Sequence, residues 1–505
     1  MKLYSTAQLR QIEAHFLQQS LPLMARAGAA AAKLALEITG AKKPTKFLIF
    51  CGSGNNGGDG LVAARLLQAA GHVVSVICPP LTDKTPADAR AAHAAYLAAG
   101  GQCHTEPLPA HQIAAYELII DAIFGIGLNR APQPPFSDWI AAINSARAKK
   151  PLDTPVLALD LPSGLQADTG IAVDAAVRAS HTLAFIGSSL GLHTADGCDL
   201  AGQISVADLG LNLQGFAHTA QIHAPQHFAP ALQPRPNNSH KGDYGNACII
   251  GGAAGMVGAA LLAGRAALHT GAGRIFVGLL AADAPAVDFV QPELMLKNAE
   301  AALQAAGKNA ALAIGPGLGQ SAAALACLQA ALPCPAPLVL DADALNLLAA
   351  HPPLLPALQQ RAAQGLATVL TPHEAEAGRL LACDAHAVHA DRLRAAQQLA
   401  QKYLAIIVLK GCGSIVATPW GEIFINPTGS PALATGGSGD VLTGMLCGLL
   451  AQSDGSAAGA LAATLAAVFV HGQAAQDLGF SRGLAAGELI PAARAALHKL
   501  ESTMI

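Results

Sequence analysis

Short apolar runs alternate with alanine- and leucine-rich helical patterns along the first half of the chain. From residue 46 onward the runs are KFLIF, HVVSVI, LIIDAIF, VLALDLPSG and HTLAFIG. Strands that alternate with helices in this way predict a parallel sheet with crossover helices packed on it. We therefore expect a layered α/β fold.

The alternation stops in residues 211–238, LNLQGFAHTAQIHAPQHFAPALQPRPNN, which are rich in Pro, His and Gln. This change predicts a domain boundary between residues 215 and 230, with domains over 1–220 and 225–505. A second α/β series follows: NACIIGG, RIFVGLL, LAIGPG, PLVLDADALN, ATVLTPHE, AIIVLKG and GSIVATP. Because open parallel sheets bind ligands beyond the carboxyl ends of their strands, we expect one site at that edge in each domain.

The hydropathy of the chain predicts neither a membrane-spanning helix nor a signal peptide. The longest apolar run, within residues 457–470, is shorter than the roughly 20 residues that span a bilayer, so it predicts a buried helix and no membrane partner. The N-terminal residues MKLYSTAQLRQIEAHF place Ser5 and Gln8 as a helix-capping box and lack the apolar core of a signal peptide. We expect a cytoplasmic protein.

Charge and metal-ligand spacing exclude further classes. The net charge is −3 and no basic run occurs, which argues against nucleic acid as a main partner. Ten cysteines without a CxxC pair predict reduced core residues, with neither a disulfide framework nor a zinc site. The pairs His223/His227 and His386/His389 lie in polar stretches, where we expect solvated side chains.

The first glycine-rich loop is CGSGNNGGDG, residues 51–60, between an apolar strand and an apolar helix. Glycine lets backbone N–H groups approach a ligand closely, and the helix N-terminus is positive, so the loop predicts a phosphate or pyrophosphate site. The acidic residue that ordinary NAD sites carry after the second strand is missing, because HVVSVICPP has no carboxylate before Asp83. Gly58-Asp59 stands where a Walker A loop needs Lys-Ser/Thr. A tight turn without a ligand is the alternative.

Three strand ends of the first half carry polar side chains. If the strands are neighbours, Asn56, Asp121 and Ser163 converge as hard oxygen ligands suited to an alkali or alkaline-earth cation. Asp160 then faces the substrate. Helix capping is the alternative for each of these residues.

In the second half, Thr435-Gly-Gly-Ser-Gly-Asp440-Val-Leu-Thr-Gly444 combines glycines with a carboxylate at a predicted helix start. Free N–H groups there form an anion hole for a transferred phosphoryl group. Asp440 can take the proton of an attacking hydroxyl. A plain N-cap is the alternative.

GNNGGDG, DAIFGIGL and DLPSG, in this order, resemble the NAD(P)H-hydrate epimerase domain of the YjeF family over residues 1–215. The resemblance implies a Rossmann-like three-layer domain in which Asn56, Asp121 and Ser163 bind K⁺ and Asp160 is catalytic. It also implies that two loops contact the hydrated dinucleotide: Asn55, Asn56, Gly57, Gly58 and Asp59, and Gly125, Ile126, Gly127, Leu128, Asn129, Arg130 and Ala131. Ile126 replaces the usual Thr, which matters only if that side chain binds substrate.

Residues 230–500 resemble the ADP-dependent NAD(P)H-hydrate dehydratases of the ribokinase-like superfamily through TGGSGD, HKGDYG, GPGLG, DADALN, TPHEAE and KGCGS. The resemblance implies ADP as co-substrate with Mg²⁺, near which Glu376 and Asn346 act through water or are structural. Asp440 is then the catalytic base. The implied nucleotide contacts are Lys410, Gly411, Cys412, Gly413, Ser414 and Gly439, and the implied substrate contacts are Gly317, His373, Asp440 and Ala259.

Together the two resemblances imply a homo-oligomeric, bifunctional repair enzyme. It would interconvert the R and S epimers of NADHX and NADPHX and dehydrate the S epimer with ADP, leaving AMP and phosphate. Two alternatives stay open: the second domain is a kinase for a small alcohol, or the first is a non-catalytic binding module.

Overall fold

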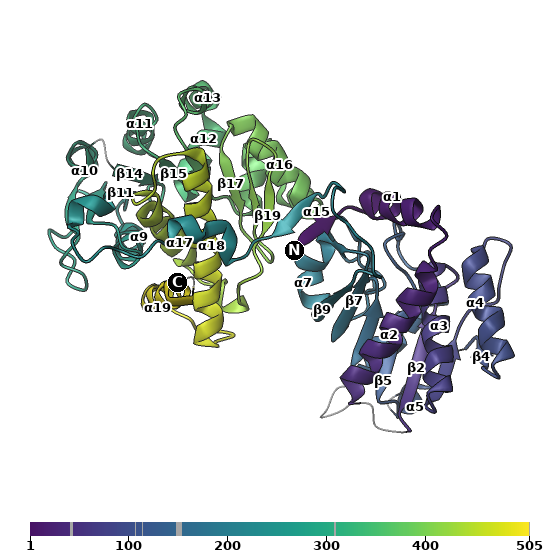
Figure 1. The fold of residues 1–505 in the computed structure, drawn as a ribbon. Coiled ribbons are helices and arrows are strands. Elements are labelled where there is room, and N and C mark those ends of the chain that lie inside the picture. The colour runs from purple at the N-terminus through teal and green to yellow at the C-terminus, as the bar shows by residue number, and fades with distance from the viewer. Residues whose placement is uncertain (41–43, 107, 114, 148–153, 308–309, 504–505) are drawn as a thin grey trace. The chain divides into compact units, whose positions relative to one another are not determined.

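The computed structural model describes the 505-residue chain except residues 41–43, 107, 114, 148–153, 308–309 and 504–505. The chain forms two compact units, residues 1–221 and 222–505 (Figure 1). The division falls inside the Pro-, His- and Gln-rich segment. Each unit is built around a mainly parallel sheet, which confirms the predicted α/β fold.

The first unit contains a seven-stranded parallel sheet in the order β4-β3-β2-β5-β6-β7-β9. Its strands are β2 (Lys46–Cys51), β3 (Val73–Ile77), β4 (Cys103–His104), β5 (Leu118–Ala122), β6 (Val156–Leu159), β7 (His181–Phe185) and β9 (Gln203–Ala207). The chain runs outward from β2 to β4 and then returns to the other side of β2 with β5. This reversal of strand order creates a crevice beyond the carboxyl ends of β2 and β5.

Helices cover both faces of this sheet. The helices are α1 (Thr6–Leu17), α2 (Leu23–Thr39), α3 (Asn55–Ala69), α4 (Ala87–Ala98), α5 (Ala110–Ile113), α6 (Phe136–Arg147) and α7 (Gly197–Leu200), with the 3₁₀ turn η1 (Leu190–His193). Along β2, Phe47, Ile49 and Cys51 pack in the core shared with α1–α3, whereas Leu48 and Phe50 pack with α6 on the opposite face. Continuous apolar strands are typical of a sheet that is buried on both faces.

The chain termini of the first unit pair with each other. β1 (Lys2–Tyr4) pairs in parallel with β8 (Ser188–Ser189) and antiparallel with β10 (Ala220–Ile222). The predicted Ser5–Gln8 capping box follows β1 and opens α1, with both reciprocal hydrogen bonds present. α1 is thereby fixed beside the crevice.

The second unit has its own sheet, with β13-β12-β11-β14-β15-β16-β17 parallel and β18 and β19 antiparallel. The strands are β11 (Asn246–Gly251), β12 (Arg274–Leu279), β13 (Met295–Asn298), β14 (Ala310–Ile314), β15 (Leu338–Leu340), β16 (Thr368–Leu370), β17 (Ile406–Leu409), β18 (Ile415–Ala417) and β19 (Ile423–Ile425). The order reverses between β11 and β14. A second crevice therefore lies beyond the ends of these two strands.

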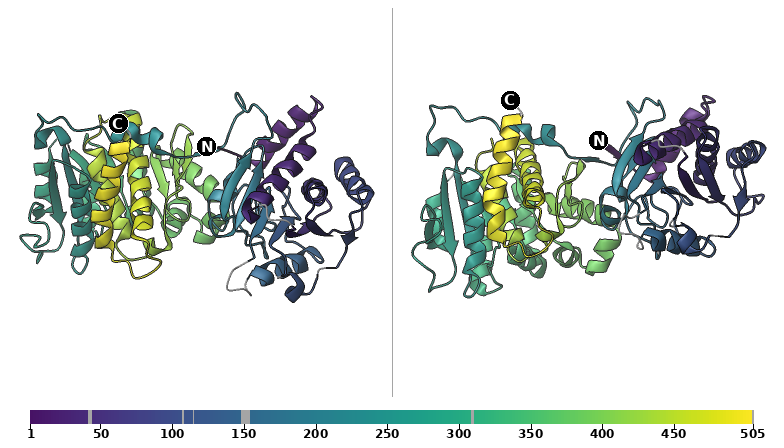
Figure 2. Two further views of the ribbon diagram at one scale, coloured as in Figure 1. Left: turned by 60° about the horizontal axis from the view of Figure 1, so that its bottom comes forward. Right: turned by 90° about the horizontal axis from the view of Figure 1, so that it is seen from below.

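Two groups of helices cover this sheet. α9 (Val257–His269) and α17 (Ser438–Leu450) pack on one face, with α18 (Ala457–Leu478) and α19 (Ala486–Thr503) against them. Figure 2 shows these yellow C-terminal helices gathered on one side of the strands. The other helical elements are α8 (Pro225–Phe228), α10 (Ala299–Ala306), α11 (Ala322–Ala331), α12 (Ala342–Ala350), α13 (Leu355–Ala363), α14 (Glu374–Leu381), α15 (Ala385–Ala390), α16 (Arg392–Tyr403), η2 (Ala229–Ala231), η3 (Lys241–Tyr244), η4 (Pro352–Leu354) and η5 (Pro431–Leu433).

The long apolar run near residue 460 lies in α18, as the sequence predicted. α18 is the one helix among the described residues that is long and apolar enough to cross a membrane, and 78% of its most apolar stretch is buried. Its partners are α17 and α19, so its apolar surface is already covered by protein.

Three sequence-based expectations are wrong. The cysteines are not all core residues, because Cys383 and Cys412 are exposed. GSIVATP forms an antiparallel strand, β18. The connection between β17 and β18 has too few residues for the crossover that a parallel strand requires. His223 is fully buried instead of solvated, packed against the rings of Phe228 and Phe469, with Nε2 2.6 Å from Asn426 Oδ1. Burial lowers the pKa of His223 to about 4, so the ring is neutral at pH 7.

Arg361 on α13 joins the amino ends of two strands that lead to the second site. Its guanidinium donates to the carbonyl oxygens of Leu332, Cys334 and Ala336, just before β15, and to Thr368 Oγ1 at the start of β16. Burial lowers the pKa of Arg361 to about 10, which leaves the group charged at pH 7. These bonds satisfy carbonyl oxygens that the neighbouring strands do not reach.

We expect Arg361→Met to destabilise the second unit by about 3 kcal/mol, because several buried carbonyl groups lose their donor. Urea denaturation would measure the loss, and hydrogen exchange should show weaker protection in β15 and β16. Arg394→Met, at an exposed position of α16, is the matched control and should change stability by less than about 0.5 kcal/mol. Equal stability of the two variants would contradict the role of Arg361 as a stabilising donor to these carbonyl groups.

Candidate active sites

The crevice of the first unit holds a cavity of about 580 Å³. Both predicted loops reach it, through Asn55, Asn56, Asp59, Gly125, Ile126, Gly127, Leu128, Asn129 and Arg130. Gly57, Gly58 and Ala131 do not line it. A Cβ at Gly57 would lie 1.9 Å from the carbonyl oxygen of Gly52, and one at Gly58 would lie 2.6 Å from Met24 Cε. These two glycines are therefore required for packing of the loop and helix α3.

Sequence reasoning missed the contribution of α1 to this cavity. Arg10 and Glu13, on consecutive turns of α1, line the wall together with the predicted loops. Their spacing of three residues is the signal that places both side chains on one helix face.

Asp160 follows β6 in a backbone conformation unusual for a residue with a side chain, with φ of +69°. Its Oδ2 accepts a 2.8 Å hydrogen bond from the backbone N–H of Ile126, in the neighbouring loop. Burial raises the pKa of Asp160 to about 6, although the hydrogen bonds oppose the shift. A strained residue with a raised pKa at a cavity wall is characteristic of a proton-transfer group.

The Ile126 substitution does not remove this contact. The loop holds Asp160 through a backbone N–H group, which every residue type except proline supplies. The Ile126 side chain instead packs against the apolar cores on either side.

Asp59 lies close enough to Asp160 for the two charges to interact. Burial raises the pKa of Asp59 well above its usual value, and the negative charges of Asp160 and Glu13 raise it further. Two carboxyl groups that share one site do not both ionise readily, so we expect the pair to share a proton near neutral pH.

Asp121 and Ser163 meet behind the cavity wall. Ser163 donates to Asp121 through both its hydroxyl, at 2.7 Å, and its backbone N–H, at 2.8 Å. Asn56, the remaining residue of the predicted set, follows β2. Its Nδ2 donates to Leu159 O, and its buried Oδ1 has no partner. Burial raises the pKa of Asp121 to about 6 despite these bonds. An unpaired amide oxygen, a carboxylate and a hydroxyl fit a hard cation such as K⁺.

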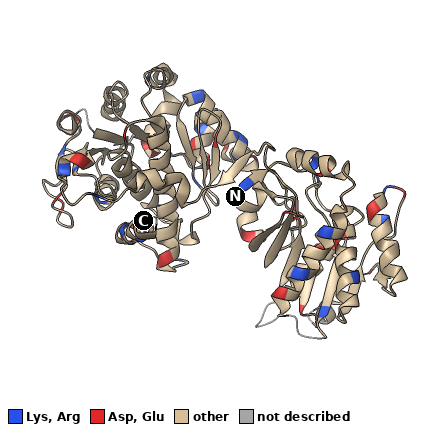
Figure 3. Ribbon diagram, in the orientation of Figure 1, with Lys and Arg blue, Asp and Glu red and all other residues tan. Residues whose placement is uncertain are grey.

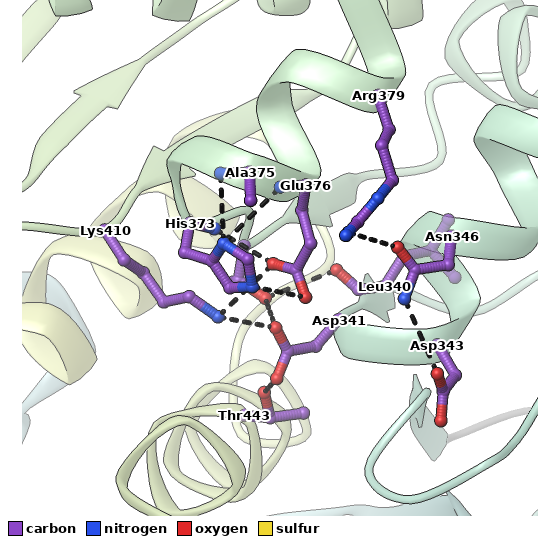
Figure 4. A network of polar contacts seen from close by, with 11 residues as sticks. Leu340, Asp341, Asp343, Asn346, His373, Ala375, Glu376, Arg379, Lys410 and Thr443 are labelled. Atoms are coloured by element: carbon purple, nitrogen blue, oxygen red, sulfur yellow. Dashed lines mark hydrogen bonds and ion pairs between the residues drawn. The ribbon is translucent and has the colours of Figure 1, made fainter. Parts of the chain in front are cut away.

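In the second unit, charged positions are mostly scattered along the ribbon (Figure 3). One of the largely buried ion pairs lies at the carboxyl ends of the strands. Lys410 Nζ, at the end of β17, lies 2.8 Å from Asp341 Oδ1, at the end of β15. Thr443, on α17, donates to the same carboxylate at 2.7 Å (Figure 4). Thr371, at the end of β16, donates to it at 2.8 Å. Three adjacent strand ends and one helix thus meet at Asp341.

Asp341 is ionised in this arrangement. Burial would raise its pKa, but Lys410 and the two hydroxyl donors outweigh burial and lower it. The carboxylates likewise outweigh the effect of burial on Lys410 and raise its pKa. Sequence analysis placed Asp341 in a motif but gave it no role; its signal was an acidic residue directly after an apolar strand.

His373 and Glu376 cap the first turn of α14 beside this pair. His373 N–H donates to Glu376 Oε2, and His373 Nδ1 accepts from the N–H groups of Ala375 and Glu376 (Figure 4). Glu376 Oε2 also lies 3.9 Å from Lys410 Nζ. Asn346 bonds to Arg379 and, at 3.5 Å, to Asp343, so a structural role explains its position.

Asp440 lies in the first turn of α17, which starts directly after the glycine loop. Burial raises its pKa to about 6; Asp341 adds to the shift and Lys410 opposes it. A Cβ at Gly439 would lie 3.6 Å from Lys410 Nζ, so the loop backbone approaches the ion pair closely. The buried His471, whose pKa burial lowers to about 4, donates from Nε2 to Ser438 O and supports the same turn.

The remaining predicted residues divide between two places. Gly317, with φ of +56°, packs against Ala259 at the crevice between β11 and β14, where a Cβ would lie 3.1 Å from Ala259 Cβ. Lys410, Gly411, Cys412, Gly413 and Ser414 form the turn from β17 to β18, and Ser414 Oγ donates to Gly411 O.

Comparison with known proteins agrees with this arrangement. Residues 20–191 match the family described as YjeF-related protein N-terminus, and residues 247–492 match the family described as NAD(P)H-hydrate dehydratase. The bifunctional NAD(P)H-hydrate repair enzyme Nnr of Coxiella burnetii is 37% identical over 506 residues, covering 97% of this chain and 98% of that protein. The Escherichia coli protein of the same name is 37% identical and covers 88% of this chain and 83% of its own length.

The chain belongs to the family of bifunctional NAD(P)H-hydrate repair enzymes. This confirms the predicted fusion of an epimerase domain with a dehydratase domain, and it decides against a small-alcohol kinase and a non-catalytic binding module. Among solved structures, the ADP/ATP-dependent NAD(P)H-hydrate dehydratase of Bacillus subtilis, co-crystallised with ATP and Mg²⁺, is 29% identical. The match covers 56% of this chain and 100% of the Bacillus subtilis chain, with a TM-score of 0.47.

We expect Gly125→Ala to reduce epimerisation by about 10- to 100-fold, because the new Cβ would lie 2.5 Å from Asp160 Oδ2 and displace the carboxylate. Gly127→Ala is the matched control, since the nearest atom there, Arg10 Nη2 at 3.3 Å, can move away. The assay is interconversion of the R and S epimers. Similar rates for both variants would contradict the position given to Asp160.

The dehydration rate should fall as the pH drops below about 6, because Asp440 must be ionised to accept a proton. In Asp341→Asn this acidic limb should move to lower pH, since the negative charge that raises the pKa of Asp440 is gone. Asp343→Asn, which removes a weaker influence, should move it less in the same direction. The pH profile of kcat/KM measures both shifts. If the acidic limb of Asp341→Asn stays at the same pH or moves to higher pH, the interaction between Asp341 and Asp440 is refuted.

Proposed function

We propose that Asp440 is the general base of the dehydratase and acts on the C6 hydroxyl of S-NADHX or S-NADPHX. The observation that carries this proposal is a half-buried carboxyl group, with its pKa raised to about 6, at the first turn of a glycine-led helix. Asp440 takes the hydroxyl proton while the oxygen attacks the terminal phosphorus of ADP, which releases AMP. Departure of phosphate from C6 and of a proton from C5 then restores the ring double bond.

The glycine loop provides the anion-binding surface for this transfer. Backbone N–H groups at the start of α17 face the phosphoryl group, and the helix dipole adds positive potential there. Lys410, held by Asp341, supplies a fixed positive charge beside the loop. Lys410, Gly411, Cys412, Gly413, Ser414 and Gly439 are the proposed nucleotide contacts, and Gly317, His373 and Ala259 contact the hydrated nicotinamide.

Mg²⁺, when bound with ADP, would neutralise phosphate charge during transfer. Glu376 is a buried carboxylate 3.9 Å from Lys410 Nζ and fits a water-mediated contact with the ion. We assign Asn346 a structural role because Arg379 already occupies its amide oxygen.

In the first unit we propose that Asp160, together with Asp59, moves the proton during loss and return of oxygen at C6. Both carboxyl groups line the cavity and have raised pKa values, and that of Asp160 is about 6. K⁺ would be held by Asn56, Asp121 and Ser163 and would supply positive charge behind the substrate phosphate-binding loop. K⁺ would also provide a partner for the buried Oδ1 of Asn56, which accepts no hydrogen bond.

We further propose a cytoplasmic location, because the substrates NADHX and NADPHX arise from cofactors that are dissolved in the cytoplasm. A homo-oligomer is proposed from the family resemblance alone. No nucleic acid or membrane enters this reaction.

The decisive experiment mixes the full chain with both epimers of hydrated NADH, ADP and Mg²⁺ and follows the return of dihydronicotinamide absorbance. The native chain should recover essentially all of the cofactor quickly. Asp160→Asn should recover the S fraction quickly and then slow to spontaneous epimerisation; Asn tolerates the positive φ of this position. Asp440→Asn should recover almost none but still interconvert the epimers. Full recovery by Asp160→Asn would refute the role of Asp160 in epimerisation. Dehydration by Asp440→Asn at the native rate would refute the role of Asp440 as general base.

A further inference from the structure

Two cysteines and a histidine converge at an edge of the first unit's sheet, away from the cavity. Cys78 follows β3, His93 lies on α4 and Cys103 begins β4, and one ligand atom from each lies within 4.8 Å of the other two. Among the described residues this is the one such cluster of histidine, cysteine or acidic side chains with metal-ligand geometry. The cysteine spacing in the sequence predicts no zinc site, because the three residues lie far apart along the chain.

The backbone holds all three ligands in place. Cys103 pairs with Val76 in the parallel ladder, and Cys78 N–H donates to His104 O at 2.8 Å. His93 lies one turn before Tyr96, whose buried ring packs against Gly101 in the turn that leads to Cys103. Ligands on rigid elements bind a metal without a large cost of ordering.

The chemistry of the three groups is that of a thiophilic metal site. The sulfur atoms of Cys78 and Cys103 and one ring nitrogen of His93 lie within 4.8 Å of one another, a spacing that one metal ion can bridge. Cys78 is buried, whereas His93 and Cys103 are half-exposed, which leaves one side open to solvent. Two thiolates and one imidazole with an open position match the ligand set of tetrahedral Zn²⁺ sites.

We propose that Cys78, His93 and Cys103 bind one Zn²⁺ ion, with water as the fourth ligand. Binding displaces the two thiol protons into solvent, so the two thiolates balance the charge of the ion. The neutral His93 ring contributes one nitrogen.

The site would brace the wall of the epimerase cavity. It joins β3 and β4 to α4, and the start of α4 supplies Pro86 and Asp88 to the cavity lining. α4 also packs directly on the glycine loop, since a Cβ at Gly58 would lie 3.1 Å from Ala89 Cα. The proposed role is therefore structural, and it is independent of the chemistry assigned to Asp160.

The test uses the full chain, reduced and freed of metal with a chelator, and Co²⁺ as the spectroscopic probe. We expect one equivalent of Co²⁺ to produce thiolate-to-metal charge-transfer absorption and the intense visible bands of tetrahedral cobalt, and Zn²⁺ to displace it. Cys103→Ser and His93→Gln should weaken binding at least about tenfold and remove or alter the bands. Zn²⁺ should raise the Tm of the native chain but not that of Cys103→Ser.

Cys383→Ser is the matched control because it removes an exposed cysteine elsewhere in the chain. It should bind Co²⁺ as the native chain does. Circular dichroism would establish that each variant is folded, and both altered ligands are half-exposed, so the fold should tolerate them. Absence of thiolate bands in the native chain, equal affinity of Cys103→Ser, or loss of binding in Cys383→Ser would each overturn the proposal.

Discussion

Parallel strand pairing is the constraint on which both sites depend. A parallel sheet brings the carboxyl ends of all its strands to one edge, whatever the distance between them in the sequence. In the first unit this edge brings together the loops after β2, β5 and β6; in the second it brings Asp341, Thr371 and Lys410 to the ends of three adjacent strands. The reversal of strand order in each sheet then opens the crevice beside those residues.

A buried carboxyl group with a raised pKa is a feature that the two sites share. Asp160 and Asp440 both have pKa values raised to about 6, mainly because each loses water contact. Such a group can accept and return a proton near neutral pH, which an exposed aspartate does far less well. Asp341 shows the opposite outcome in a similar environment, since Lys410 and two hydroxyl donors keep it ionised. The positive charge of Lys410 beside Asp341 therefore separates this carboxylate from Asp160, whose pKa burial raises.

Glycine serves two purposes in these loops. Gly57 and Gly58 are packed against backbone and the Met24 side chain, so they allow α3 to begin directly below β2. Gly125 leaves room for the Asp160 carboxylate, and Gly439 lets the start of α17 approach Lys410. A glycine motif alone does not distinguish the two purposes, because close packing and ligand approach require the same absence of a side chain.

The sequence by itself determined the α/β class of both units and the motifs that identify the family. It also determined β2, β3 and β5 to β7 of the first sheet and β11, β12 and β14 to β18 of the second, but neither β4 nor β13. These features are local: apolar runs specify strands, and glycine-rich junctions specify the loops that follow them. The tertiary structure alone decided which of the loop residues reach the cavity, that Asp341 gathers Lys410, Thr371 and Thr443, and that Cys78, His93 and Cys103 meet. It also decided that His223 is buried and that β18 runs antiparallel. Such contacts join residues far apart in the chain, and they follow from how the strands are ordered and packed, which hydrophobic periodicity does not encode.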